Sequence, residues 1–258
     1  MKTNVKKQIL ELAQQGKRID DRAFDEFRPV SIEYDISVNA EGSAMVSLGN
    51  TKVNAGVKMD VAEPYPDSPN KGNLMVGLEL SPIAAPQFEP GPPSIDSIEI
   101  SRVIDRGVRE ANAVNFEKLC IKEGELVWQV FIDEYAIDSD GNVLDAGAIA
   151  AIAALANTKL PKLDEENKVD YKEKNSKKLE LRNVPLACTV VKIENFLLVD
   201  PNSKEEEVAD SKLTITMSEH GIHGIQKGNG VLTEQEIAEC ITLAKKATDK
   251  LRKQLKLK

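Results

Sequence analysis

Three closely spaced arginines form the most chemically suggestive pattern in this chain. Arg102, Arg106 and Arg109 are related as i, i+4 and i+7, and residues at this spacing share one face of an α-helix. A row of guanidinium groups is suited to paired hydrogen bonds with phosphates. The alternative is a solvated helix face on which Asp105 and Glu110 are local ion-pair partners.

Apolar residues of the same segment predict which face of this helix is buried. Their spacing places them opposite the arginines; they are Ile98, Val103, Ile104 and Val108. We therefore expect these residues to pack inward, and the arginines to face solvent, a partner or a polyanion.

Composition limits the class of protein. The chain has 258 residues, of which 34 are basic and 42 acidic, for a net charge of -8. This balance argues against nucleic-acid binding through bulk charge, so any such contact must be local. The three cysteines are far apart and form no CxxC motif, which indicates neither a disulfide framework nor a zinc site. No apolar run approaches the roughly 20 residues needed to span a bilayer, and the N-terminus lacks the apolar segment of a secretory signal, so we expect a soluble, cytoplasmic protein.

The first half of the chain predicts a helix, a charged arm and an antiparallel meander. The helix is expected over residues 4–15. Residues 16–29 are dense in opposite charges and are expected to be extended, held by ion pairs and a partner surface. Strand patterns lie at 30–39, 43–48, 52–59, 74–80 and 126–135. Residues 144–155 are small and apolar all round, which predicts a buried helix.

The second half repeats strands followed by a helix. Residues 157–178 are charged and contain Pro161, which favours an irregular linker or exposed excursion. Strands are expected at 186–193, 196–199 and 212–218, then a hairpin through 220–224 and a capped helix over 233–258. We expect an α+β fold, with a first domain over 1–156, a linker over 157–184 and a second domain over 185–258.

Six motifs in order resemble the RNase PH family of phosphorolytic ribonucleases, and within it a non-catalytic core-ring subunit of the archaeal exosome. They lie at Gly16–Arg22, Arg28–Pro29, Gly42–Val53, Ser101–Arg109, Asp138–Ala146 and Asp200–Glu206. The resemblance implies an RNase PH-like fold of two βαβα-type halves, with mixed sheets packed against helices. It also implies that this chain forms a hetero-hexameric ring with a catalytic paralogue. RNA-binding cap subunits and single-stranded RNA are the other implied partners.

The resemblance also predicts where the chemistry of active members should lie. Those members hold phosphate at a Gly-Thr-Arg or Ser-Ser-Arg-like turn at a helix N-terminus, where the arginine grips the anion. We expect that position at Asp145–Ile149. There Ala148 lacks a hydroxyl, and Ile149 replaces the arginine.

Active members carry two catalytic carboxylates, at positions that correspond to Glu206 and Lys212 in this chain. A lysine in a two-carboxylate site repels a divalent ion, so we expect no metal, no cofactor and no catalytic residue in this chain. The acidic run at residues 205–207 would by itself be a solvated turn. His220 and His223 share a face, but no nearby residue completes a metal site, which favours a turn role.

The resulting hypothesis is a non-catalytic ring subunit that completes the RNA channel and active site of its paralogue for 3′-to-5′ phosphorolytic RNA degradation. Arg102 and Arg106 are its expected RNA contacts, while Arg109 can turn to an interface or to Glu110. RNA contacts by Lys58 and Lys71 are left open. Two alternatives remain: a divergent exoribonuclease that is active by itself, and a scaffold that never touches RNA.

Overall fold

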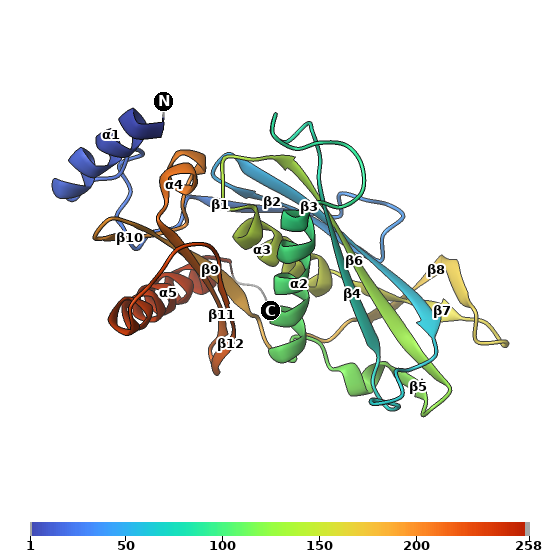
Figure 1. Ribbon diagram of the computed structural model, residues 1–258. Helices are drawn as coiled ribbons and strands as arrows, with labels where there is room; N and C mark the ends of the chain where they lie inside the picture. Colours follow the sequence, from blue (N-terminus) through green and yellow to red (C-terminus); the bar gives the residue numbers. More distant parts are fainter. Residues whose placement is uncertain (1, 256–258) are drawn as a thin grey trace.

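A computed structural model describes residues 2–255, without the side chains of Lys2 and of residues 172–176 (Figure 1). Its first half is a six-stranded sheet in the order β1-β2-β3-β6-β4, with the short β5 paired to β6. The sheet is mixed, because β4 runs parallel to β6 and every other pair is antiparallel. The strands are β1 (Val30–Tyr34), β2 (Gly42–Leu48), β3 (Thr51–Ala62), β4 (Asn73–Leu80), β5 (Cys120–Lys122) and β6 (Leu126–Asp138).

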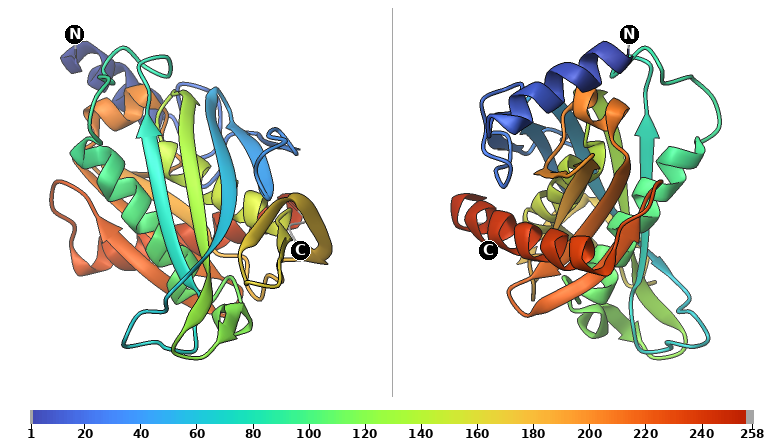
Figure 2. Two further views of the ribbon diagram at one scale, coloured as in Figure 1. Left: turned by 90° about the vertical axis from the view of Figure 1, so that its right-hand side faces the viewer. Right: turned by 60° about the vertical axis from the view of Figure 1, so that its left-hand side comes forward.

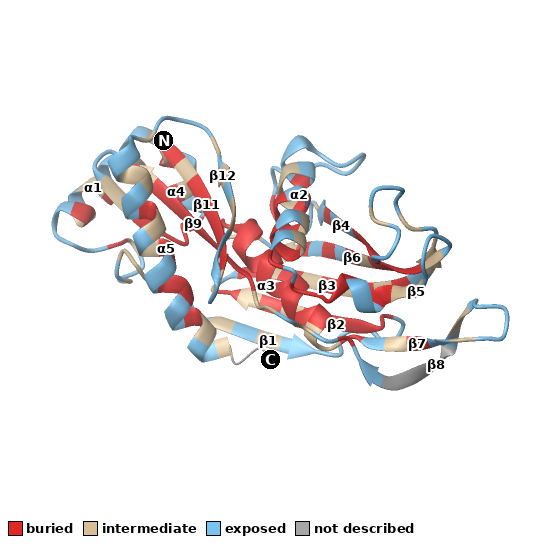
Figure 3. Cartoon of the chain, turned by 90° about the horizontal axis from the view of Figure 1, so that it is seen from below, coloured by how far each residue is buried: buried red, intermediate tan, exposed pale blue. Residues whose placement is uncertain are grey.

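Two helices cover one face of this sheet (Figure 2). Helix α2 (Ile95–Glu110) lies against β4, and α3 (Val143–Ala156) lies across β2 and β3. Every residue of α3 from Val143 to Leu155 is buried, as Figure 3 shows. The prediction of a buried helix is confirmed, because small alanine side chains let the sheet, α2 and the second half of the chain all approach α3.

The second half is an antiparallel sheet in the order β10-β9-β11-β12. Its strands are β9 (Leu186–Ile193), β10 (Phe196–Val199), β11 (Ser211–Ser218) and β12 (Gly221–Lys227). Helix α5 (Glu234–Leu255) packs against β9, β10 and β11, while α3 also contacts β9. Thr233 and Glu236 make the reciprocal cap predicted for α5; residues 256–258 of the expected helix lie outside the described residues.

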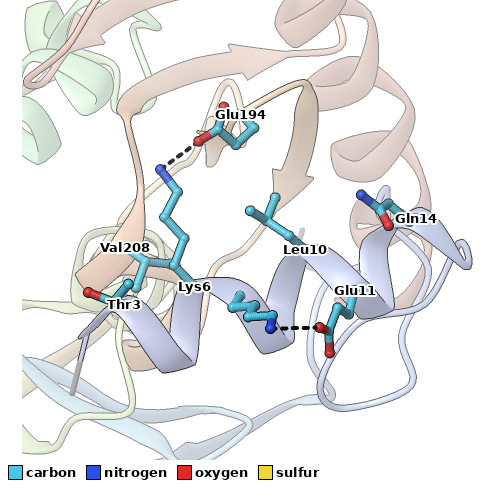
Figure 4. Close-up of a pocket in the computed structure, with 8 residues that line it drawn as sticks. Thr3, Lys6, Leu10, Glu11, Gln14, Glu194 and Val208 are labelled. Carbon is cyan, nitrogen blue, oxygen red and sulfur yellow. Dashed lines mark ion pairs between the residues drawn. The ribbon is translucent and has the colours of Figure 1, made fainter.

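Helices α1 (Lys2–Gln14) and α4 (Ser203–Val208) pack together at one end of the second sheet. Ile9 of α1 joins a small core with Val191, Ile193, Leu198 and Val208. On its outer flank, α1 lines a groove with Glu194, in which Lys6 pairs with Glu194 at 3.1 Å and Lys7 with Glu11 at 3.8 Å (Figure 4). Within the described part of the chain, no helix has the length and apolar character that a bilayer crossing requires.

Several elements differ from the sequence predictions. The expected linker at 157–178 contains an antiparallel hairpin, β7 (Lys159–Leu163) and β8 (Val169–Lys178), which extends from the body in Figure 1. It is anchored where Lys58 lies 4.8 Å from the centre of the Tyr171 ring. Strand β1 ends at Tyr34 rather than residue 39, because Asp35 adopts a left-handed backbone with φ of 57°. A short 3-10 helix over Phe116–Leu119 was not predicted.

Candidate nucleic-acid interface

Helix α2 positions the arginine row. Its N-cap is Ser94, whose side chain accepts the backbone N–H of Ser97. The predicted inward residues Val103, Ile104 and Val108 are buried. The prediction for Ile98 was wrong, since it is 49% exposed. One turn nearer the N-terminus the buried positions belong to two serines, Ser97 and Ser101, and Ser97 donates its hydroxyl to the carbonyl of Leu78 on β4.

The three arginines have different surroundings. Arg102 and Arg106 are exposed, and neither forms a hydrogen bond or ion pair with any described residue. Arg109 instead holds Asp105 at 2.9 Å and the carbonyl oxygen of Leu74 at 3.1 Å. It therefore ties α2 to β4, whereas the other two guanidinium groups keep their donors available.

These arginines line a groove between α2 and the edge strand β4. The groove has a volume of about 350 Å³, and Leu74, Met75, Val76 and Asp105 complete its lining. An anion that entered it would meet Arg102 and Arg106 together, with planar donors that suit phosphate oxygens.

Lys58 and Lys71, whose contact with RNA the sequence analysis left open, do not line the arginine groove. The Lys58 ammonium donates to Glu41 Oε1 at 2.8 Å and to the carbonyl oxygen of Asn39 at 2.9 Å. It is thus committed to contacts within the chain. Lys71 is exposed in the loop before β4.

The start of α3 corrects the expected phosphate position. The helix begins at Val143, after Asn142 in a left-handed conformation with φ of 55°. Ala148 and Ile149 therefore lie in the second turn, where Ile149 is fully buried in the core. The first turn, Val143–Ala146, contains no arginine, serine or threonine. The prediction that Asp145–Ile149 lies at a helix N-terminus is therefore wrong, and the absence of a phosphate-gripping arginine stays a prediction.

The turn before α3 is rigidly held. Arg28 donates to the carbonyl oxygens of Asp140 at 2.8 Å and Gly141 at 3.1 Å, and Thr51 Oγ1 donates to that of Gly141 at 2.7 Å. Gly141 has φ of 82°, a conformation that glycine adopts without strain. Ser203, at the start of α4, donates its hydroxyl to Asp140 Oδ1 at 2.7 Å.

Behind this turn lies a buried group of charges centred on Asp200. Its carboxylate accepts from Arg28 at 2.7 Å, from Arg22 at 3.0 Å and from Asn142 Nδ2 at 2.7 Å. Asn142 Nδ2 also donates to Asp145 at 2.8 Å. Burial raises the pKa of Asp145 to about 6, although hydrogen bonds from Asn142 and Thr189 oppose the shift. The ion pairs predicted for the charged arm are confirmed, and they join it to the second half of its own chain. The partner surface stays a prediction.

Glu205 was wrongly placed in a solvated turn. Its carboxylate is fully buried and pairs with both Arg18 Nη2, at 2.6 Å, and Arg18 Nε, at 3.0 Å. Residues 203–208 form α4, and Asn202 and Glu205 cap it reciprocally. The sequence signal was present, since an asparagine followed three residues later by glutamate is a helix-start pattern.

Glu206 and Lys212 share a cleft with the start of α3. The cleft has a volume of about 400 Å³, and its lining includes Gly141, Asn142, Val143 and Leu144. Burial raises the pKa of Glu206, while the Lys212 ammonium and a hydrogen bond from the backbone N–H of Asn142 act in the opposite direction.

His220 lies in the β11–β12 turn, and His223 lies near the start of β12. His223 Nε2 lies 2.7 Å from Ser218 Oγ, and the backbone N–H of His220 donates to the same hydroxyl at 3.1 Å. Both contacts are those of a structured turn. No group of three His, Cys, Asp or Glu side chains among the described residues is arranged to hold a metal ion.

Comparison with known proteins identifies the family to which this chain belongs. The model of the 3′ exoribonuclease family matches the chain in both parts, domain 1 at residues 26–161 and domain 2 at residues 183–247. The chain belongs to the 3′ exoribonuclease (RNase PH) family. The α+β fold with an RNase PH-like arrangement, expected from the resemblance, is therefore confirmed.

Individual family members are similar over almost the whole chain. The exosome complex component Rrp42 of Thermococcus gammatolerans is 48% identical, covering 95% of this chain and 91% of its own. Rrp42 of Methanopyrus kandleri is 42% identical, covering 96% and 94%. A solved chain described as "archaeoglobus fulgidus exosome with RNA bound to the active site" is 45% identical, with a TM-score of 0.90 and 98% coverage of both chains.

Proposed function

We propose that this chain is a non-catalytic subunit of an archaeal exosome ring. In this role it supplies Arg102 and Arg106 to the RNA path beside an active site carried by a catalytic paralogue, which performs 3′-to-5′ phosphorolysis. RNA-binding cap subunits complete the assembly, and the complex is cytoplasmic. The similarity to Rrp42 chains over nearly the full length supports membership of the ring.

The observation that carries the RNA contact is the difference between the arginines of α2. Arg109 donates hydrogen bonds to Asp105 and to the carbonyl oxygen of Leu74. Arg102 and Arg106 are exposed without a partner among the described residues. An unpaired guanidinium at a groove is available to phosphate without first breaking an ion pair. A solvated helix face with neutralised arginines would have shown the opposite arrangement.

The chemistry around α3 supports the non-catalytic role. Its first turn, Val143–Ala146, carries neither a hydroxyl nor a guanidinium, the groups with which the family resemblance implies that active members hold phosphate. Lys212 stands beside Glu206 where a second carboxylate is needed. The helix dipole contributes about 1 kcal/mol to anion binding, which does not replace the lost bidentate contact.

The test is RNA binding by the ring assembled from this chain and its catalytic paralogue. The double variant Arg102→Gln/Arg106→Gln is expected to bind single-stranded RNA at least about tenfold more weakly, since each lost charged hydrogen bond costs on the order of 1.5–3 kcal/mol. The slope of log K against log salt should become shallower by about 0.7 for each phosphate contact removed.

The matched control removes the same charge from α5, in Lys245→Gln/Lys253→Gln, both exposed. It should leave the affinity and the salt slope close to those of the unmodified ring. If the arginine variant behaves like this control, the chain is a scaffold that does not touch RNA, and the proposal is wrong.

A further inference from the structure

The groove between α2 and β4 has two walls of different chemistry. On the α2 side, Arg102 and Arg106 supply charged donors. The β4 side is apolar and consists of Leu74, Met75 and Val76. Leu74 is 2% exposed and Val76 is half-buried, whereas Met75 is 51% exposed. Among the described residues that line this groove, Met75 is therefore the apolar side chain with the largest surface for a ligand to cover.

Met75 projects from the face of the first sheet that α2 and α3 leave uncovered (Figure 2). Successive side chains of a strand point to opposite faces, and its neighbour Leu74 belongs to the core beneath the two helices. Phe131 of β6 is the register partner of Met75, so the two side chains lie side by side on the uncovered face. A flat apolar group at the rim of the groove would rest on Met75, with Phe131 next to it.

The contacts of α2 with β4 limit what this groove can bind. Its one carboxylate, Asp105, is paired with Arg109 at 2.9 Å, so it does not oppose an anion at the other two arginines. The edge of β4 is closed to an added strand, because the carbonyl oxygen of Leu74 accepts from Arg109 and that of Leu78 accepts from the Ser97 hydroxyl. An acidic peptide in extended form is thus disfavoured, and a simple phosphate ion would leave Met75 uncovered. A nucleotide strand offers both an anion and a flat apolar group.

We infer that Met75 contacts a base of the RNA strand whose phosphates are held by Arg102 and Arg106. The inference rests on the proposed function, because it takes this groove as part of the RNA path, and it adds a contact with the bases to the contact with the backbone. The thioether of methionine is flexible and polarizable, and it packs favourably on aromatic rings. Every base has such a face, so the contact serves a strand of any sequence.

The test is binding of single-stranded RNA by the ring assembled from this chain and its catalytic paralogue. Met75→Ala is expected to weaken binding by about three- to tenfold. The slope of log K against log salt should stay as in the unmodified ring, because no phosphate contact is removed. Met75→Leu, which keeps an apolar side chain of similar volume, should bind within about twofold of the unmodified ring.

A second ligand identifies the part of the RNA that Met75 touches. Abasic RNA of the same length keeps every phosphate and lacks the bases, so Met75→Ala and the unmodified ring should bind it equally. The matched control is Ile98→Ala, because Ile98 is 49% exposed on the same helix as the arginines and does not line the groove. This control should leave the affinity for both RNAs unchanged.

Three results would overturn the inference: full affinity of Met75→Ala for ordinary RNA, an equal loss on abasic RNA, or the same loss in Ile98→Ala. These results differ from a failure of the proposed function. The arginine contacts are measured by the salt slope, whereas the contact of Met75 is measured by dependence on the bases at constant slope. A weakened arginine variant with a normal Met75→Ala would therefore reject the base contact alone.

Discussion

Glu134 provides the sharpest test of how the first domain is stabilised. Its side chain is 1% exposed on β6, and neither carboxyl oxygen has a hydrogen-bond partner among the described residues. Ala55 and Leu78 flank it on the adjacent strands, and a Cβ on Gly147 of α3 would lie 3.1 Å from its Oε2. A buried polar group without partners costs about 1–3 kcal/mol.

Replacing Glu134 by methionine removes this cost with a side chain of similar length. We expect Glu134→Met to raise the free energy of unfolding at pH 8 by about 1–3 kcal/mol. For a chain of this size, each kcal/mol corresponds to a rise in Tm of about 2–4 °C. The matched control is Glu123→Met, in the exposed turn before β6, which should change stability by less than about 0.5 kcal/mol.

The effect of Glu134 should depend on pH in a defined direction. Burial raises the pKa of Glu134 well above its usual range, so the folded chain binds a proton that the unfolded chain has already lost. The free energy of unfolding therefore falls as pH rises between the unfolded and folded pKa, by up to about 1.4 kcal/mol per pH unit. Urea unfolding from pH 4.5 to 9 should show the advantage of the methionine variant growing with pH. A variant less stable than the original, or a constant difference across this range, would refute the reasoning.

Three further predictions concern the contacts behind α3. Glu205→Gln should lower the free energy of unfolding by about 3–5 kcal/mol in urea titrations, because it leaves Arg18 buried without its counterion; a loss below about 1 kcal/mol would contradict this. Gly141→Ala should destabilise the chain by about 1–3 kcal/mol, since φ of Gly141 is 82° and Ser203 leaves no room for an added Cβ. An unchanged Tm would contradict this prediction. Asp145 should titrate near pH 6 by carboxyl ¹³C NMR, and because that pKa is raised, its contribution to stability falls as pH rises from about 4 to about 6.

Periodicity was sufficient to predict much of this fold. The alternation in the early strands predicted the meander of β1, β2 and β3, and the capping pair of Thr233 and Glu236 predicted the start of α5. The apolar composition of residues 144–155 predicted a buried helix, because an apolar run of this length without a polar face exceeds a typical buried strand.

The failures have physical reasons. Hairpin β7–β8 is rich in charge and includes Pro161, so its sequence shows no regular apolar alternation. Strand pairing, the contact of Lys58 with Tyr171 and the packing of Leu160, Leu163 and Val169 against the main core hold it. Glu205 resembled a surface residue because its partner, Arg18, is 187 residues away in the chain. Such a pairing is set by tertiary structure.

The arginine row shows, within one helix, what spacing can predict and what only the structure can show. Spacing alone placed Arg102, Arg106 and Arg109 on a common face, but only the structure shows that Arg109 is bound to Asp105 and Leu74. The expected helix start was wrong for a related reason. The Asp145–Ile149 segment resembled a phosphate cradle at a helix N-terminus, yet the helix begins at Val143, after the left-handed Asn142.

The most direct test of the central claim is phosphate-dependent degradation of a single-stranded, poly(A)-like RNA. The chain is assayed first alone and then after mixing with its catalytic paralogue. We expect no degradation by the chain alone and processive degradation by the mixture. Degradation by the purified chain alone would contradict the claim, because it would require a functional phosphate site at the start of α3 despite Val143, Leu144 and Lys212.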